Sequence, residues 1–253
     1  PYPAEKVNLA DFLRVTENDI EEMWAELLEI LRSIKDEYIN LLIKKFISEK
    51  QFVAAFKKVP AGLQVHHPFI GGLLEHTLNV VRAAKAILPL YPELNADLVL
   101  AGAFLHDVGK VAELMAGTSI RYTDYGQLVG HIPIGVIMVA QKAEEVAREI
   151  GKPFPAKTLH LLEHIILSHH GTGEYGSPKL PAIPEAFLVH YLDNLDAKVF
   201  MATQAIEEDR NEAESFTTYQ RQLETRIYKR SNQLLQPKST DTDEDKPLFD
   251  DSD

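Results

Sequence analysis

The segment Leu98–Lys110, LVLAGAFLHDVGK, decides the fold of this chain. Its apolar run from Leu98 to Leu105 leads into His106 and Asp107, and Gly109 and Lys110 follow. An apolar run without alternation predicts a helix that is buried on all sides, and we expect the glycine to end it. An imidazole, a carboxylate and an ammonium at a buried helix end are costly unless they are paired or hold a metal ion. The segment therefore predicts a central helix that presents candidate functional groups.

Helical patterns continue on both sides of this segment. Thr16 is followed by Asp19 at the spacing of a capping box, Asn95 is a candidate N-cap, and Pro184 is a candidate first helical residue. The other predicted helices cover residues 20–34, 38–47, 52–56, 73–88, 131–150, 156–169, 184–208 and 216–235. The turn-forming and β-branched residues of segment 117–128 predict a loop or a small hairpin. Because almost no alternating strand pattern occurs elsewhere, the expected fold class is all-α, a helical bundle with an N-terminal helical extension.

We expect four parts in the chain. Residues 1–15 are an irregular lead-in, and residues 16–62 are a helical extension packed on the core. Residues 63–236 form the domain with the candidate site, and residues 237–253 form an acidic tail that we expect to be disordered.

Composition narrows the classes of function. The chain has 253 residues, enough for one sizeable core, and no cysteine, which excludes disulfides and thiolate metal sites and fits the cytoplasm. No apolar run reaches the length of a membrane span and no signal peptide is evident, so we expect no membrane contact. The net charge is −12, of which the tail carries −5. Since an acidic protein binds polyanions poorly, a phosphate-ester substrate would need bound cations.

Five predicted helices carry groups that can bind a metal. These groups are His76, the pair His106 and Asp107, His131, the pair His169 and His170, and Asp193. Any one of them has an ordinary alternative explanation as a core histidine, a helix cap or an ion-pair member. Together they form an ordered set of imidazoles and carboxylates on inward faces, which packing alone rarely produces. We therefore predict a metal centre that uses nitrogen and oxygen ligands only.

These motifs resemble a known family. The run of His, His-Asp and distal Asp is similar to that of HD-domain metal-dependent phosphohydrolases. The segments GGLLEHTLNVV, LAGAFLHDVGK, LVGHIPIG, ILSHHGTGEYGSPKLP and EAFLVHYLDNLDAK resemble the HD domain of YhaM-type 3′-to-5′ exoribonucleases, over residues 10–235. The resemblance implies the HD-domain helical bundle. It also implies an enzyme that releases nucleoside 5′-monophosphates from the 3′ ends of single-stranded RNA or DNA.

The resemblance also implies roles for individual residues. Asp107 would bridge two ions and take part in catalysis, and Lys110 would contact the scissile phosphate; its alternative role is a cation at a helix C-terminus. The set that holds the first ion is His76, His106, Asp107 and Asp193. The second ion would be held by His131 and His169, with His170 as a further ligand. The expected cofactor is one or two divalent ions, with manganese favoured over magnesium, iron or cobalt.

Weaker candidates surround this set. His67, Arg121 and Lys179 are candidate substrate contacts, although the last two are equally typical of solvated charges. Residues with a supporting or packing role are expected to be His160, His164, His190, Asn194 and Asp196.

Two other functions remain open at this point. The first is an HD phosphohydrolase of small nucleotides or cyclic dinucleotides; the loop after His170 is similar to that of HD-GYP proteins, but the GYP triplet is absent. The second is a non-catalytic, metal-stabilised regulatory module that binds nucleic acid. The resembling family usually carries an OB-fold before the HD domain, and residues 1–15 would be at most its trailing end. The OB groove supplies affinity for a long strand. The sequence leaves the oligomeric state open.

Overall fold

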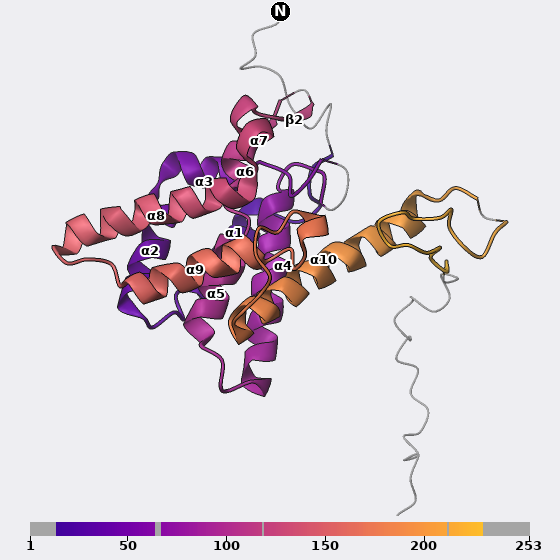
Figure 1. Cartoon of the computed structure of the whole chain (residues 1–253). Helices are drawn as coiled ribbons and strands as arrows, with labels where there is room; N and C mark the ends of the chain where they lie inside the picture. Colours follow the sequence, from indigo (N-terminus) through magenta and orange to yellow (C-terminus); the bar gives the residue numbers. More distant parts are fainter. Residues whose placement is uncertain (1–13, 64–66, 118, 212, 230–253) are drawn as a thin grey trace, which may run out of the picture. The chain divides into compact units, whose positions relative to one another are not determined.

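The computed structural model describes residues 14–63, 67–117, 119–211 and 213–229 (Figure 1). Over these residues the all-α prediction is confirmed. The helices are α1 Ile20–Leu31, α2 Glu37–Ser48, α3 Lys50–Phe56, α4 Gly72–Ile87, α5 Ala96–Leu105, α6 Lys110–Glu113, α7 Asp124–Val129, α8 His131–Ile150, α9 Ala156–Ser168 and α10 Pro184–Glu208, with short 3-10 turns at Leu88–Leu90 and Gly173–Tyr175. The predicted lead-in up to residue 13 and the predicted acidic tail lie outside the described residues.

The helix α5 lies at the centre of the core, as the apolar run in Leu98–Lys110 predicts. All of its residues from Leu98 to Leu105 are buried, and it packs against α2, α4 and α9. The helix α4 also packs on α1, and α8 packs on α2 and α9 (Figure 1). Burying each large apolar side chain contributes about 1.5–3 kcal/mol, so α5 holds the ends of several neighbouring helices close to its own C-terminus.

The helix ends follow local capping chemistry, with one correction. Asn95 caps α5 by accepting from the Leu98 N–H at 3.1 Å, and α10 begins at Pro184, both as predicted. The prediction of a capping box at Thr16 is wrong. The Asp19 carboxylate caps α1 instead and accepts from the N–H groups of Glu21 and Glu22 at 2.8 and 2.9 Å. A carboxylate at a helix N-terminus also gains from the helix dipole.

A small hairpin follows α6. Strand β1, Leu114–Ala116, pairs antiparallel with β2, Ile120–Tyr122. A hairpin is therefore confirmed, but it lies at residues 114–122, and the prediction is wrong for residues 124–128, which are helical. The residues after it form α7, which Thr123 caps by accepting from the Gly126 N–H at 2.8 Å. Thr123 also donates its own N–H to the carbonyl of Glu113 at 2.9 Å, so the hairpin is tied to the end of α6.

The chain divides into two compact units, Pro1–Met201 and Ala202–Asp253. The predicted helix over residues 216–235 is wrong for its described part. Residues 216–229 double back instead, with antiparallel bridges at Phe216–Tyr228 and Gln220–Thr225. The Thr217 N–H donates to Ile227 O at 2.9 Å, and the Thr217 hydroxyl accepts from the Ile227 N–H at 3.0 Å. This pairing satisfies backbone groups that a helix over the same residues would have satisfied internally.

Among the described helices, none combines the length and the hydropathy needed to cross a membrane.

Candidate metal centre

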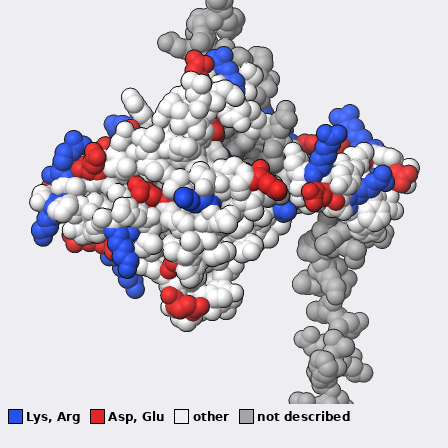
Figure 2. Space-filling view, in the orientation of Figure 1, with Lys and Arg blue, Asp and Glu red and all other residues white. Residues whose placement is uncertain are grey.

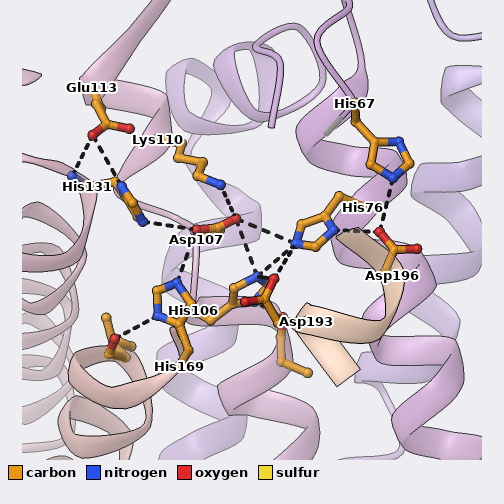
Figure 3. Close-up of polar contacts among 12 residues, drawn as sticks. His67, His76, His106, Asp107, Lys110, Glu113, His131, His169, Asp193 and Asp196 are labelled. Carbon is orange, nitrogen blue, oxygen red and sulfur yellow. Dashed lines mark hydrogen bonds and ion pairs between the residues drawn. The ribbon is translucent and has the colours of Figure 1, made fainter. Parts of the chain in front are cut away.

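The predicted ligands converge at one point of the first unit, as Figure 3 shows. His76 lies on α4 and Asp193 on α10. His106 and His169 are the C-caps of α5 and α9, and His131 is the first residue of α8. The side chains of the buried members His76, His106, Asp107 and His169 are at most 1% exposed. Five helices therefore place ligand-competent groups around the turn that contains Asp107.

Asp107 lies between two pairs of imidazoles, one pair for each carboxylate oxygen. Its Oδ2 lies 3.6 Å from Nε2 of His76 and 3.4 Å from Nε2 of His106. Its Oδ1 lies 3.5 Å from Nε2 of His131 and 3.6 Å from Nε2 of His169. Each oxygen and its pair of nitrogens can thus face a separate ion, so the carboxylate has the position of a bridging ligand.

Backbone carbonyls set the tautomers of two of these histidines. The Nδ1 of His106 lies 2.8 Å from the carbonyl oxygen of Ala103, and the Nδ1 of His169 lies 2.8 Å from that of Ile166. A carbonyl oxygen only accepts, so the Nδ1 atoms carry the proton and donate. In the neutral rings Nε2 then presents a lone pair to the centre, as a metal ligand requires.

Carboxylates hold the other two histidines from behind. The Nδ1 of His76 lies 2.7 Å from Oδ2 of Asp196. The Nδ1 of His131 lies 3.2 Å from Oε1 of Glu113, which also accepts from the His131 backbone N–H at 2.9 Å. A carboxylate behind a ligating imidazole orients the ring and raises its basicity. Figure 3 shows Asp196 behind His76 and Glu113 behind His131.

The side of the centre around Oδ1 has the character of a cation site. Oδ1 of Asp107 and the Nε2 atoms of His131 and His169 are buried, and none has a hydrogen-bond partner among the described residues. Leaving such atoms unsatisfied costs about 1–3 kcal/mol each. Three buried acceptors that face one another match the nitrogen and oxygen ligands that divalent ions of the Mn, Fe, Co and Mg type accept. The residues therefore fit the expected metal. His170 completes a group with His131 and His169 that could hold an ion.

The side around Oδ2 is hydrogen-bonded. The ammonium of Lys110 donates to Oδ2 of Asp107 at 2.5 Å, and both side chains are buried. Asp193 places its Oδ1 3.2 Å from Nε2 of His76 and 3.9 Å from Nε2 of His106. The carboxylate of Asp193 thus lies beside the first pair of imidazoles.

The electrostatics of the centre suit cation binding. Burial alone would lower the pKa of His76, but hydrogen bonds to Asp193 and Asp196 raise it to about 9. Burial raises the pKa of Asp107, yet the charges of Lys110 and His106 hold it well below its usual range. Burial and the neighbouring imidazoles lower the pKa of His169, so that ring is neutral at pH 7. A bound ion would have to displace the proton from His76.

Two glycines allow backbone segments near the centre to lie in direct contact. Gly109 has ordinary helical dihedrals and follows the end of α5 at Leu105, so the expectation that it ends the helix is wrong. Its function is space, because a Cβ there would lie 2.0 Å from the carbonyl oxygen of His131. Gly72 at the start of α4 serves the same purpose, since a Cβ would lie 2.1 Å from the carbonyl oxygen of His67.

The remaining predicted residues lie in different surroundings. His67 is only 2% exposed and its Nε2 lies 3.0 Å from Oδ2 of Asp196, so the structure places it behind the ligands. Arg121 on β2 is exposed, with its Nε 3.1 Å from the sulfur of Met115. Lys179 is exposed in the loop before α10. Neither lies within the group of ligands.

Two further histidines support the loop after α9. The Nε2 of His164 accepts from the Ala182 N–H at 2.9 Å. The Nδ1 of His190 lies 2.7 Å from the carbonyl oxygen of His169. These contacts match the supporting and packing roles expected for them. His160 is exposed. The predictions missed Glu113, whose only sequence signal is its position three residues after Lys110.

The chain is similar in sequence to known proteins. Residues 73–198 match the family model described as HD domain. The chain is 40% identical over 203 residues to the 3′-5′ exoribonuclease YhaM of Bacillus subtilis (strain 168), an alignment that covers 80% of this chain and 62% of the relative. It is 38% identical over 206 residues to the protein of that name from Geobacillus sp. (strain WCH70), covering 81% and 61%.

The chain spans about three fifths of the length of these curated relatives. No solved structure matches it. The matched residues contain every predicted ligand from His76 to Asp193. On the family-model match and these relatives, the chain belongs to the HD-domain family.

Proposed function

We propose that this HD domain holds two divalent cations and hydrolyses the phosphodiester bond at the 3′ end of RNA, releasing nucleoside 5′-monophosphates. The relatives that are 37–40% identical are named 3′-5′ exoribonucleases, and this supports the direction and the substrate. Two-ion sites of this kind act on phosphodiesters by in-line displacement.

One observation carries the proposal: each oxygen of Asp107 faces its own pair of imidazole nitrogens. A carboxylate that served only as an ion-pair partner would be satisfied by Lys110. Here the second oxygen is buried and has no hydrogen bond among the described residues. The first ion would be held by His76, His106, Asp107 and Asp193. The second would be held by Asp107, His131, His169 and His170.

The residues of the centre divide the work of such a reaction. Bound divalent ions supply a nucleophile from water near neutral pH and neutralise phosphate charge. Lys110, buried beside Asp107, would supply a positive charge to stabilise the charge that grows on the phosphate oxygens in the transition state. The outer carboxylates of Asp196 and Glu113 keep the imidazoles in orientation, so little reorganisation accompanies the reaction.

Bound metal cations, rather than a basic surface patch, would attract the RNA to this protein. On the face shown in Figure 2, Lys and Arg of the described residues are interspersed with Asp and Glu rather than gathered in one basic patch. Bound cations would then provide most of the attraction for the terminal phosphate. Arg121 and Lys179 remain predicted substrate contacts. Manganese, with magnesium, iron and cobalt as alternatives, the cytoplasmic location and the oligomeric state also remain predictions.

The test combines metal analysis with degradation of RNA. The chain, loaded with Mn²⁺, is incubated with a 5′-labelled oligoribonucleotide and, separately, with nucleotides and cyclic dinucleotides. We expect two ions per chain, stepwise shortening from the 3′ end and nucleoside 5′-monophosphates as products. Asp107→Asn should abolish both metal binding and hydrolysis, whereas the matched control Asp124→Asn, an exposed carboxylate on α7, should keep both.

Other results would overturn the proposal. Turnover of nucleotides or cyclic dinucleotides alone would assign the centre to the small-molecule phosphohydrolases. RNA binding without any turnover in the presence of Mn²⁺ would favour a regulatory module.

A further inference from the structure

His67 lies behind the metal ligands in a position that simple packing does not explain. Its imidazole is 2% exposed, and its ring stacks on Phe200 of α10 with centroids 4.1 Å apart. Both of its ring nitrogens face carboxylates. Nε2 lies 3.0 Å from Oδ2 of Asp196, and Nδ1 lies 3.5 Å from Oε1 of Glu75. An apolar side chain would fill the same space without these two contacts.

The backbone holds this ring in place at the cost of strain. His67 has a φ of +43°, in the left-handed region that residues with a Cβ rarely adopt. Its carbonyl oxygen accepts from the N–H groups of Ala61 and Phe69 at 3.2 and 2.9 Å, and Gly72 leaves room for that oxygen. Strained conformations persist where the surroundings over-determine them, and they cluster at functional sites.

The contacts of His67 connect the metal centre with the segment that precedes α1. Oδ2 of Asp196 lies within hydrogen-bond distance of both Nε2 of His67 and Nδ1 of His76, at 3.0 and 2.7 Å. On the other side, Glu75 accepts from the hydroxyl of Thr16. The Thr16 N–H donates to Ile70 O, and the Ile70 N–H donates to Arg14 O, both at 3.0 Å. A continuous chain of contacts thus runs from residues 14–16 through His67 to a metal ligand.

We propose that His67 is a positioning residue: it holds Asp196 against His76 for the first ion, and through Glu75 it links metal binding to the docking of residues 14–16. The inference rests on the proposed two-ion centre. It assigns His67 a place behind the ligands in place of the substrate contact predicted from the sequence. Outer partners of ligating histidines change metal affinity by about 10- to 100-fold.

Two amide substitutions separate the two sides of the ring. The amide nitrogen of glutamine reaches about as far as Nε2 of histidine, and that of asparagine about as far as Nδ1. His67→Gln therefore keeps the contact with Asp196, and His67→Asn loses it. Titration with Mn²⁺ followed by electron paramagnetic resonance should show two ions in each protein. We expect affinity for one ion to fall about 10- to 100-fold in His67→Asn and to stay within about threefold in His67→Gln.

The link to residues 14–16 has its own measurement. Because coupling between sites is reciprocal, Mn²⁺ should slow hydrogen exchange at the amides of Thr16 and Ile70. The slowing should disappear in Glu75→Ala, which removes the contacts of this carboxylate with His67 and Thr16 and leaves Asp196 in place. Glu75→Gln, whose amide can keep both contacts, is the matched control and should retain the slowing. No slowing in the unmodified protein would overturn the link.

The outcomes separate this inference from the proposed function. Unchanged Mn²⁺ binding in His67→Asn, with RNA degradation intact, overturns the positioning role and leaves the proposed function standing. Equal losses in the asparagine and glutamine variants would make His67 a packing residue and would also overturn it. Binding of Mn²⁺ that depends on His67, in a protein that degrades no RNA, would support the positioning role and refute the proposed function.

Discussion

Replacing Gly109 by alanine should weaken binding of the second ion and leave the affinity for the first nearly unchanged. A Cβ at this position would lie 2.0 Å from the carbonyl oxygen of His131 and 2.8 Å from the backbone nitrogen of Gly135. Both contacts are with the backbone of α8, so a rotamer change cannot relieve them. The start of α8 would have to move by more than about 1 Å to reach ordinary contact distance. Such overpacking costs about 1–3 kcal/mol.

The consequence for the metal follows from the position of His131 at the first residue of α8. Metal–ligand distances hold within about 0.2 Å, so a movement of 1 Å removes His131 from the second site. His76, His106 and Asp193 lie on other helices. We therefore expect a loss of at least about tenfold in affinity for one ion, or about 1.4 kcal/mol, and near-normal affinity for the other.

The assay is a Mn²⁺ titration that counts ions per chain, together with thermal unfolding. Gly135→Ala is the matched control, because a Cβ there meets only Ile166 Cγ2 at 3.4 Å and two atoms farther away. It lies within α8, where alanine is favoured over glycine by about 0.5–1 kcal/mol. Two ions of unchanged affinity in Gly109→Ala would refute the argument that this contact places His131.

The remaining predictions concern the groups around Asp107. Lys110→Gln should lower kcat for RNA about 10²- to 10³-fold while Mn²⁺ still binds, and a normal kcat would exclude a role in the transition state. Glu113→Ala should weaken one Mn²⁺ site about 10- to 100-fold; Glu113→Gln should restore it, because one amide oxygen can accept both His131 donors, and titration would detect a failure of this rescue. In the metal-free protein the pKa of His76 is about 9 against 6.5 when unfolded. The folded state therefore keeps a proton that the unfolded chain releases. The contribution of this proton to the free energy of unfolding is complete below pH 6.5, and it falls by about 3 kcal/mol as the pH rises through 9. Urea unfolding at both pH values should show the fall in the unmodified protein and not in His76→Gln.

Much of the fold follows from local patterns in the sequence. The buried run from Leu98 to Leu105 predicts α5 because an apolar helix has to be surrounded by others. Asn95 and Pro184 mark helix starts by chemistry within one turn. The segment 216–229 shows the limit of such reasoning. Its predicted helix competes with pairing between Thr217 and Ile227, ten residues apart, which no local pattern records.

By itself the sequence determined most of the longer helices and which side chains can bind a metal, because capping, periodicity and ligand chemistry act over a few residues. Only the tertiary structure decided how those side chains face one another. It placed each oxygen of Asp107 before its own pair of imidazoles, Glu113 behind His131, and His67 behind Asp196. These arrangements depend on the packing of helices that are far apart in the chain, and packing fixes side-chain direction to within a fraction of an ångström.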